Sequence, residues 1–281
     1  MVNFNGQLFN ELHTFLSYKN RGLRYGDALF ETLRTREGKI IFWEDHYLRL
    51  MASMRMLRME IPLNFTMEFL EEQITGTLRV NGLDTVSARV RFTVFRDSDG
   101  LYLPDQNDIA YIIEAHPLTH PFYIWTKKSY EVELFKDFYA NADLLSTLKT
   151  NNKMLNVLGS IYAKENGYQS CLLLNGAKQV VEALHGNLFL VQGATIRTPP
   201  ISDGALNGII RKKLLEIGKK LDTYSIEEAS ISPFDLQKAD ELFITNAIIG
   251  IQPITKYRKK EFATTVAQEL LGKLNLLARL H

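Results

Sequence analysis

Two prolines within five residues, Pro117 and Pro121, interrupt the chain between two stretches that each carry strand and helix patterns. Proline fixes its own φ angle and lacks a backbone N–H, so this segment is typical of a connection between domains. The chain has 281 residues, which is long for one hydrophobic core and comfortable for two. We therefore predict a smaller N-terminal domain at 1–115, a linker at 116–122 and a larger domain at 123–281.

The N-terminal part mixes strands with helices. Apolar and polar residues alternate over 86–95, which predicts a strand that presents Arg89 and Arg91 on the same face. Two further strands are expected at 28–36 and 40–43, joined by a turn. A helix should follow them, because an apolar stripe at helical spacing is formed by Tyr47, Leu50, Met51, Met54 and Leu57.

The C-terminal part has the same mixed character. We expect a strand near 122–126 and a helix from about 151 to 166. A hairpin over 171–182 should turn at Asn175, and Asn207 is a plausible N-cap for a later helix. Strands and helices in both parts predict two α/β or α+β domains with a cleft between them.

Composition excludes several classes of protein. Lys plus Arg is 33 and Asp plus Glu is 32, so no overall charge favours nucleic acid or an anionic membrane as a partner. No run approaches the roughly 20 apolar residues of a membrane span, and the first residues lack the pattern of a signal peptide. The one cysteine, Cys171, is predicted to be a small buried residue and not a nucleophile. We expect a cytoplasmic protein.

One histidine pattern could suggest a metal site. His116 and His120 have the i, i+4 spacing with which a helix can present two ligands. Pro117 and Pro121 exclude a regular helix there. No metal is therefore expected.

Six short runs, in a fixed order, carry the residues that could do chemistry. They are Arg21–Arg34, Glu44–Leu50, Ser146–Asn152, Val180–Asn187, Asn207–Arg211 and Thr245–Gly250. Each run is a weak signal alone, but the ordered set is specific. It resembles the class IV aminotransferase superfamily, the fold-type-IV pyridoxal-phosphate enzymes, over about 21–253. This superfamily includes branched-chain and D-amino-acid aminotransferases and 4-amino-4-deoxychorismate lyase.

The resemblance implies a fold and an assembly. It predicts the two-domain fold of the D-amino-acid aminotransferases, with pyridoxal 5'-phosphate in the cleft between the domains. It also predicts a homodimer, in which a neighbouring subunit completes the active site, and a small-molecule substrate.

By this resemblance Lys149 is the lysine that forms a Schiff base with the cofactor. A lysine suits this role because its amine can lose its proton when desolvated or beside another positive group, and then attacks an aldehyde. Most lysines are solvated surface charges, and Lys153 is a nearby alternative. The position of Lys149 in its run favours it over Lys153.

Other positions match cofactor contacts. Glu182 corresponds to the carboxylate that keeps the pyridine nitrogen protonated, and Arg49 to the arginine that holds the phosphate. Ile209 and Ile210 open a helix whose backbone N–H groups would bind the phosphate. Many aminotransferases carry threonine at the positions of Ile210 and Ala247, so backbone amides would have to suffice there.

These departures from the aminotransferase pattern are more like the lyases. Thr32 stands where lyases place a catalytic threonine, although a β-branched residue also suits a strand. Asn246 is another lyase-like position. Arg91 and Arg96 match basic groups on the substrate side and would suit a dicarboxylate, although a solvated strand face is the plainer alternative. Tyr25 is expected there too, by resemblance only.

We therefore predict a lyase that converts 4-amino-4-deoxychorismate to p-aminobenzoate and pyruvate, a step toward folate. An aminotransferase acting on D- or branched-chain amino acids is the alternative. A third reading is a scaffold or binding protein that keeps the fold without the chemistry, which the missing hydroxyls at Ile210 and Ala247 suggest.

Overall fold

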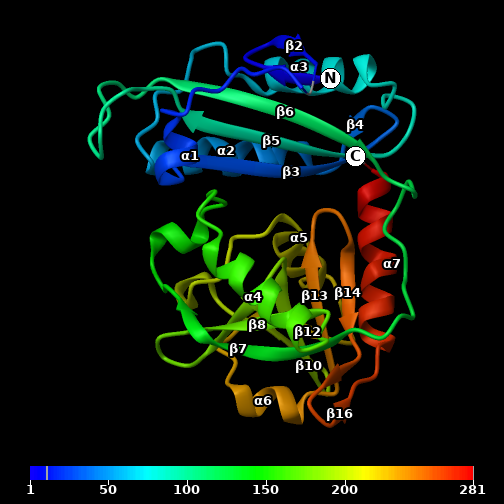
Figure 1. Ribbon diagram of the computed structural model, residues 1–281. Coiled ribbons are helices and arrows are strands. Elements are labelled where there is room, and N and C mark those ends of the chain that lie inside the picture. Colours follow the sequence, from blue (N-terminus) through cyan, green and yellow to red (C-terminus); the bar gives the residue numbers. More distant parts are fainter. Residues whose placement is uncertain (11, 281) are drawn as a thin grey trace. The chain divides into compact units, whose positions relative to one another are not determined.

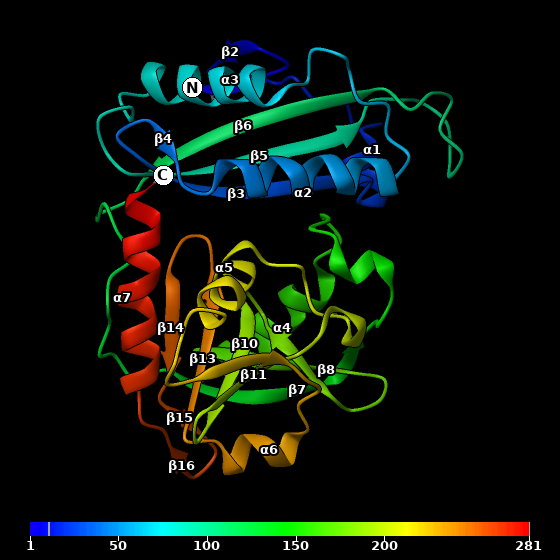
Figure 2. The ribbon, with the colours of Figure 1, turned by 180° about the vertical axis from the view of Figure 1, so that it is seen from behind.

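A computed structural model describes residues 1–10 and 12–280, and these form two compact units (Figures 1 and 2). Unit 1 contains Met1–Phe122 together with Lys149–Asn152, and unit 2 contains Tyr123–Leu148 and Lys153–Leu280. The segment Lys149–Asn152, here called the Lys149 strip, therefore belongs to unit 1, although its neighbours in the chain belong to unit 2. The predicted second domain, 123–281, is a continuous stretch of chain and therefore includes the Lys149 strip.

Unit 1 is built on one antiparallel sheet of six strands in the order β2-β1-β6-β5-β3-β4. The strands are β1 (Val2–Phe4), β2 (Gln7–Phe9), β3 (Ala28–Arg36), β4 (Lys39–Ile40), β5 (Ala88–Arg96) and β6 (Ile109–Pro117). The helices are α1 (Arg21–Tyr25), α2 (Trp43–Met56) and α3 (Met67–Val80). Helices α2 and α3 lie on one face of the sheet, the face toward the viewer in Figure 2.

The alternation in β5 explains its two faces. Residues Ala88, Val90 and Phe92 are buried, whereas Arg89 and Arg91 between them are half-buried. The prediction that both arginines share a face is confirmed, because the strand is regular and its partners in β3 and β6 follow without a shift.

Two predictions for unit 1 need correction. The strand expected at 40–43 is only β4, because Trp43 already begins α2 and the apolar residues before it are simply buried. β6 continues to Pro117, two residues past the predicted end of the first domain at 115 and into the predicted linker. Proline can close a strand there, since Pro117 is the last residue in register with β5.

Unit 2 contains two five-stranded sheets. One has the order β16-β15-β7-β8-β9 and the other β12-β11-β10-β13-β14. The strands of the first are β7 (Glu131–Ala140), β8 (Ser170–Asn175), β9 (Val180–Ala183), β15 (Lys256–Tyr257) and β16 (Lys260–Glu261). Those of the second are β10 (Asn187–Gln192), β11 (Thr195–Thr198), β12 (Ser225–Glu228), β13 (Glu241–Asn246) and β14 (Gly250–Ile254). The helices are α4 (Met154–Glu165), α5 (Ile209–Gly218), α6 (Pro233–Lys238) and α7 (Thr265–Arg279).

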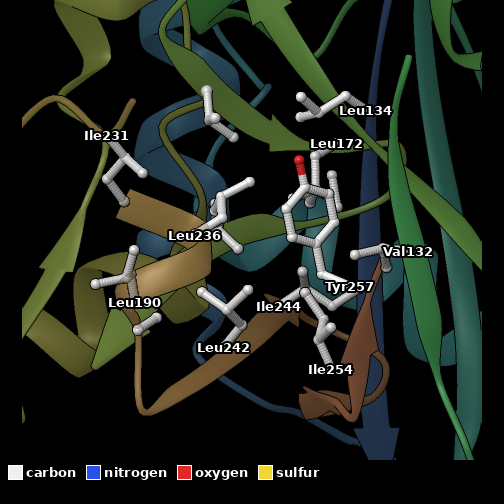
Figure 3. Close-up of a cluster of buried hydrophobic side chains, with 14 of the residues drawn as sticks. Val132, Leu134, Leu172, Leu190, Ile231, Leu236, Leu242, Ile244, Ile254 and Tyr257 are labelled. Carbon is white, nitrogen blue, oxygen red and sulfur yellow. The ribbon is translucent and has the colours of Figure 1, made fainter. Parts of the chain in front are cut away.

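The main core of unit 2 lies between its sheets. Figure 3 shows this cluster, to which β7 and β8 contribute Leu134 and Leu172 and β10 and β13 contribute Leu190 and Leu242. Helix α4 packs on the other side of β7 and β8, over a smaller cluster that includes Cys171, and α5 and α7 pack on the second sheet. Cys171 is buried, as predicted, and burial raises the pKa of its thiol to about 11, which disfavours the reactive thiolate.

Three predictions for unit 2 also need correction. No strand forms at 122–126, because the side chain of Asn275 in α7 bonds both the N–H and the C=O of Tyr123. The N-cap of α5 is Gly208 rather than Asn207. The predicted helix at 151–166 begins only at Met154, since the Lys149 strip precedes it.

The helices of both units are too short or too polar for a bilayer. Within the described part of the chain, none is long and apolar enough to cross a membrane.

Candidate active-site residues in each unit

The Lys149 strip lies along β3 and forms one isolated β-bridge with it, between Thr150 and Leu29. The N–H of Phe30 donates to the carbonyl of Lys149 at 2.9 Å, and the N–H of Asn151 donates to the carbonyl of Ala28 at 2.9 Å. β4 pairs only with the far end of β3, so this edge of β3 is open to the strip. The backbone of Lys149 is thereby anchored to the sheet of unit 1.

The side chain of Lys149 lies against an aromatic ring that a second cation also contacts. Its Nζ is 4.2 Å from the centre of the Phe30 ring, and the guanidinium carbon of Arg91 is 3.8 Å from the same centre. Arg91 also donates from Nη2 to Oδ1 of Asn151 at 3.1 Å, and its Nε lies 3.8 Å from Glu114. Burial lowers the pKa of Arg91, while Glu114 opposes this effect. Lys149 and Arg91 are thus gathered around Phe30.

Thr32 lies on the same face as this group. It is directly opposite Arg91 in the register of β3 and β5, and Phe30 is two residues before it. Residues in register and residues two apart in a strand share a face. The predicted catalytic pair, Lys149 and Thr32, and the predicted substrate residue Arg91 are therefore brought together within unit 1.

Arg49 lies on α2 and is fixed by the carboxylate of Glu31, for which no role was predicted. Its Nε donates to Oε1 of Glu31 at 2.8 Å and its Nη2 donates to Oε2 at 2.5 Å. Nδ1 of His46 lies 2.7 Å from the same Oε2. Burial alone would raise the pKa of Glu31, but the charge of Arg49 and the hydrogen bonds outweigh it and lower that pKa to about 2. Glu31 is ionised and Arg49 is held at two points.

Two other predicted substrate residues in unit 1 have different surroundings. Arg96 is buried, and its guanidinium donates to Asp27, Asn107 and the carbonyl of Leu57. Tyr25 packs between arginine side chains of α1. The structure does not bring either residue to the group around Phe30.

In unit 2, Glu182 is held at the end of β9. Its Oε2 accepts from the backbone N–H of Leu206 at 3.0 Å and from Nδ2 of Asn187 at 3.5 Å. Asn187 also donates to the carbonyl of Leu206 at 2.8 Å. Lys153 is close enough for the charge of Glu182 to raise its pKa, although burial has the larger, opposite effect and lowers it. Lys153, the alternative to Lys149, therefore lies near Glu182 in unit 2.

The N-terminus of α5 begins at a glycine, which another side chain approaches closely. Gly208 is its N-cap, and no side chain of the described residues caps the helix there. A Cβ added to Gly208 would collide with Oδ1 of Asn187. The side chains of Ile209 and Ile210 are buried, so this end of the helix offers its backbone N–H groups.

Asn246 is the last residue of β13, and Ala247 begins the turn between β13 and β14. Oδ1 of Asn246 accepts from the N–H groups of Ile248 and Ile249, and its Nδ2 donates to the carbonyl of His185. The side chain of Asn246 therefore links this turn to the segment that follows Glu182. The carbonyl of Ala247 accepts from the hydroxyl of Tyr123 at 3.3 Å.

These residues fit pyridoxal phosphate chemically. Lys149 supplies an amine and Arg49 a guanidinium, which suits a phosphate. Glu182 supplies a carboxylate for a ring nitrogen, and the glycine-capped N-terminus of α5 suits an anion. The absence of a Cβ at Gly208 allows the side chain of Asn187, which also bonds Glu182, to lie against this terminus. No role was predicted for Phe30, Glu31 or His46, although all three lie within the six runs that carry the resemblance.

Fold and residues together define a fold-type-IV pyridoxal-phosphate enzyme. Residues 28–257 match the family described as "Amino-transferase class IV". The chain therefore belongs to the class IV aminotransferase family, and the alternative of a scaffold protein without enzymatic activity is set aside.

Individual relatives carry several names. The chain is 29% identical over 273 residues to a putative branched-chain-amino-acid aminotransferase of Methanocaldococcus jannaschii, with 97% of this chain and 93% of that protein covered. It is 24% identical to an aminodeoxychorismate lyase of Vibrio harveyi, over 86% of this chain and 87% of that protein. The branched-chain aminotransferase of Thermoproteus uzoniensis, solved with norvaline, superposes with a TM-score of 0.86 at 23% identity, covering 99% of this chain and 94% of that chain.

Proposed function

We propose that this enzyme is a pyridoxal-phosphate lyase that converts 4-amino-4-deoxychorismate to p-aminobenzoate and pyruvate. The observation that carries the proposal is the position of Thr32 directly opposite Arg91, on the face where Lys149 meets Phe30. A hydroxyl, an amine and a guanidinium on one face suit a substrate that carries carboxylates and must lose a fragment. The relative from Vibrio harveyi supports the lyase reading.

Residues of both units have proposed roles toward the cofactor. Arg49 and the backbone N–H groups of Ile209 and Ile210 bind its phosphate, together with the turn at Ala247. Glu182 accepts a hydrogen bond from the pyridine nitrogen. Lys149 attaches the cofactor through its amine. When bound, the cofactor supplies an electron-poor ring that stabilises negative charge on the substrate carbon bearing the amine.

The remaining roles concern the substrate. Arg91 binds a carboxylate of the substrate. The amine of Lys149, which is free once the substrate amine has replaced it on the cofactor, removes the proton from the carbon that bears the substrate amine. The bond between the ring and the enolpyruvyl oxygen then breaks, the ring becomes aromatic, and the released fragment takes up a proton and becomes pyruvate. The Thr32 hydroxyl donates a proton to that fragment and regains one from the ammonium of Lys149, which returns to its neutral form. We assign Arg96 and Asn246 no role toward the substrate, because their polar groups form hydrogen bonds within the protein.

The test is to supply aminodeoxychorismate to the purified protein and to follow p-aminobenzoate by fluorescence and pyruvate in a coupled assay. Equimolar products are expected from the wild type. T32S keeps the hydroxyl and should retain most of the rate, whereas T32V keeps the shape without the hydroxyl and should lose about 10²-fold or more. Absence of product from a protein that carries cofactor absorbance would exclude the lyase.

An aminotransferase is the second candidate, and one comparison favours it. The relative from Methanocaldococcus jannaschii, which covers nearly the whole chain, is named a putative branched-chain aminotransferase. An amino donor should then convert the bound cofactor to its amine form, which absorbs at a shorter wavelength. A screen of branched-chain and D-amino acids would identify the donor.

We also propose a homodimer. Several large apolar side chains of unit 2 are exposed in the single chain, among them Phe138, Tyr139, Leu144 and Leu145. Large exposed apolar groups often mark an interface. Light scattering coupled to gel filtration should give about twice the mass of one chain, and a monomer at micromolar concentration would contradict this.

A further inference from the structure

Glu31 and Arg49 form a buried ion pair in unit 1, and the proposed reaction assigns no role to Glu31. Glu31 is 2% exposed, and both of its oxygens accept from Arg49. A bidentate contact of this kind fixes the plane of a guanidinium as well as its position. The orientation of the Arg49 guanidinium is therefore set by Glu31 of β3.

His46 completes the arrangement from the same helix as Arg49. It is 1% exposed, and burial lowers its pKa, so the ring is neutral. A carboxylate can only accept, so Nδ1 of His46 must carry the proton that it shares with Oε2 of Glu31. Glu31 is thus held by His46 while it holds Arg49.

We propose that Glu31 and His46 are positioning residues that orient Arg49 for the cofactor phosphate. This inference rests on the proposed role of Arg49 as a phosphate ligand. Arginine has a long flexible side chain, and ordering one such side chain on binding weakens affinity by roughly three- to tenfold. Glu31 removes this cost before the cofactor arrives, because Arg49 is already ordered.

Glu31 also has a contrary effect on the phosphate. Its charge offsets part of the positive charge of Arg49, and this alone would weaken phosphate binding. If positioning dominates, removing the charge of Glu31 weakens the affinity for the phosphate. If charge compensation dominates, the same change strengthens it.

The experiment compares the full-length E31Q, R49A and double variants with the wild type, each stripped of cofactor. Equilibrium affinities are measured for pyridoxal phosphate and for pyridoxal, which lacks the phosphate. E31Q should bind pyridoxal phosphate roughly three- to tenfold more weakly and pyridoxal as tightly as the wild type. The double variant should bind no more weakly than R49A, because Glu31 acts through Arg49. The ³¹P resonance of the bound phosphate should shift in E31Q.

The outcomes distinguish the phosphate role of Arg49 from the positioning role of Glu31. If R49A binds pyridoxal phosphate as tightly as the wild type, the phosphate role of Arg49 fails and the inference fails with it. If R49A is weakened while E31Q is unchanged or tighter, only the inference fails. Equal losses for both ligands in E31Q, or additive effects in the double variant, would show a merely structural role. Should E31Q not fold, H46N provides the same comparison, with a loss of about two- to threefold expected for pyridoxal phosphate alone.

Discussion

Lys149 is held to Phe30 at two points: its carbonyl accepts the N–H of Phe30 at 2.9 Å, and its Nζ lies 4.2 Å from the centre of the Phe30 ring. The first contact fixes the backbone and the second orients the amine. A single residue of β3 therefore controls the position of the proposed reactive group.

We expect F30L to leave the backbone contact intact and to loosen the amine. An exposed or partly exposed cation–π contact contributes about 0.5–1 kcal/mol, which corresponds to a change of roughly two- to fivefold. The visible absorbance should therefore develop that much more slowly when pyridoxal phosphate is added to F30L. F95L is the control, since Phe95 packs in a cluster with Ala28 and Ala110, and this variant should react like the wild type. Equal slowing in both variants would contradict the role of Phe30.

Arg91 and Arg89 offer a matched comparison, since they lie two residues apart on one face of β5. Arg91 is the one that contacts Phe30 and Asn151. A hydrogen bond to a charged group contributes about 1.5–3 kcal/mol, so R91Q should raise the KM for aminodeoxychorismate by about tenfold or more. R89Q should leave KM within about twofold of the wild-type value. Steady-state kinetics on both variants would measure this difference. Similar KM values for R91Q and R89Q would show that Arg91 does not bind the substrate.

Local patterns predicted the elements that depend on local chemistry. The alternation of burial over residues 88–93 of β5 is visible in the sequence, because apolar and polar residues alternate there. The prediction of a strand at 122–126 was wrong. The backbone N–H and C=O of Tyr123 bond to the side chain of Asn275, which is 152 residues away in the sequence. No window of neighbouring residues contains that information.

The same limit applies to the candidate site. The order of the six runs predicted that Lys149 and Thr32 act together, and the structure gathers both on unit 1. The contacts that hold the site were not predictable, because the bond from Leu206 to Glu182 and the bonds from Arg49 to Glu31 join residues that only the fold brings close. Glu31 lies in the first of the six runs, but no function was predicted for it. The residues next to a glutamate in a strand do not indicate whether it is buried.

Gly208 should tolerate no side chain. In G208A the added Cβ would collide with Oδ1 of Asn187, which must move and release Leu206 and Glu182. The affinity for pyridoxal phosphate is therefore expected to fall by about tenfold or more, because both the helix terminus and the carboxylate are disturbed. G176A, at the turn between β8 and β9 where a Cβ meets nothing, is the control. Fluorescence titration of both variants would show the difference, and an unchanged affinity in G208A would argue against phosphate binding at α5.

Because of Glu31, the free energy of unfolding should depend on pH between about pH 4.5 and pH 2. Its pKa is lowered from 4.5 to about 2 in the folded protein, chiefly because the charge of Arg49 overcomes the effect of burial. The stabilisation is thus fully present above about pH 4.5 and is lost as the pH falls toward 2, where the carboxylate takes up a proton in the folded state as well. The lowering corresponds to about 3 kcal/mol. Urea unfolding at about pH 5 and near pH 2.5 should show the free-energy difference between wild type and E31Q shrinking by most of that amount. E44Q, on the exposed side of α2, controls for the loss of a glutamate from the same region. A difference between wild type and E31Q that stays constant with pH would mean that Glu31 is not ionised against Arg49 in the folded protein.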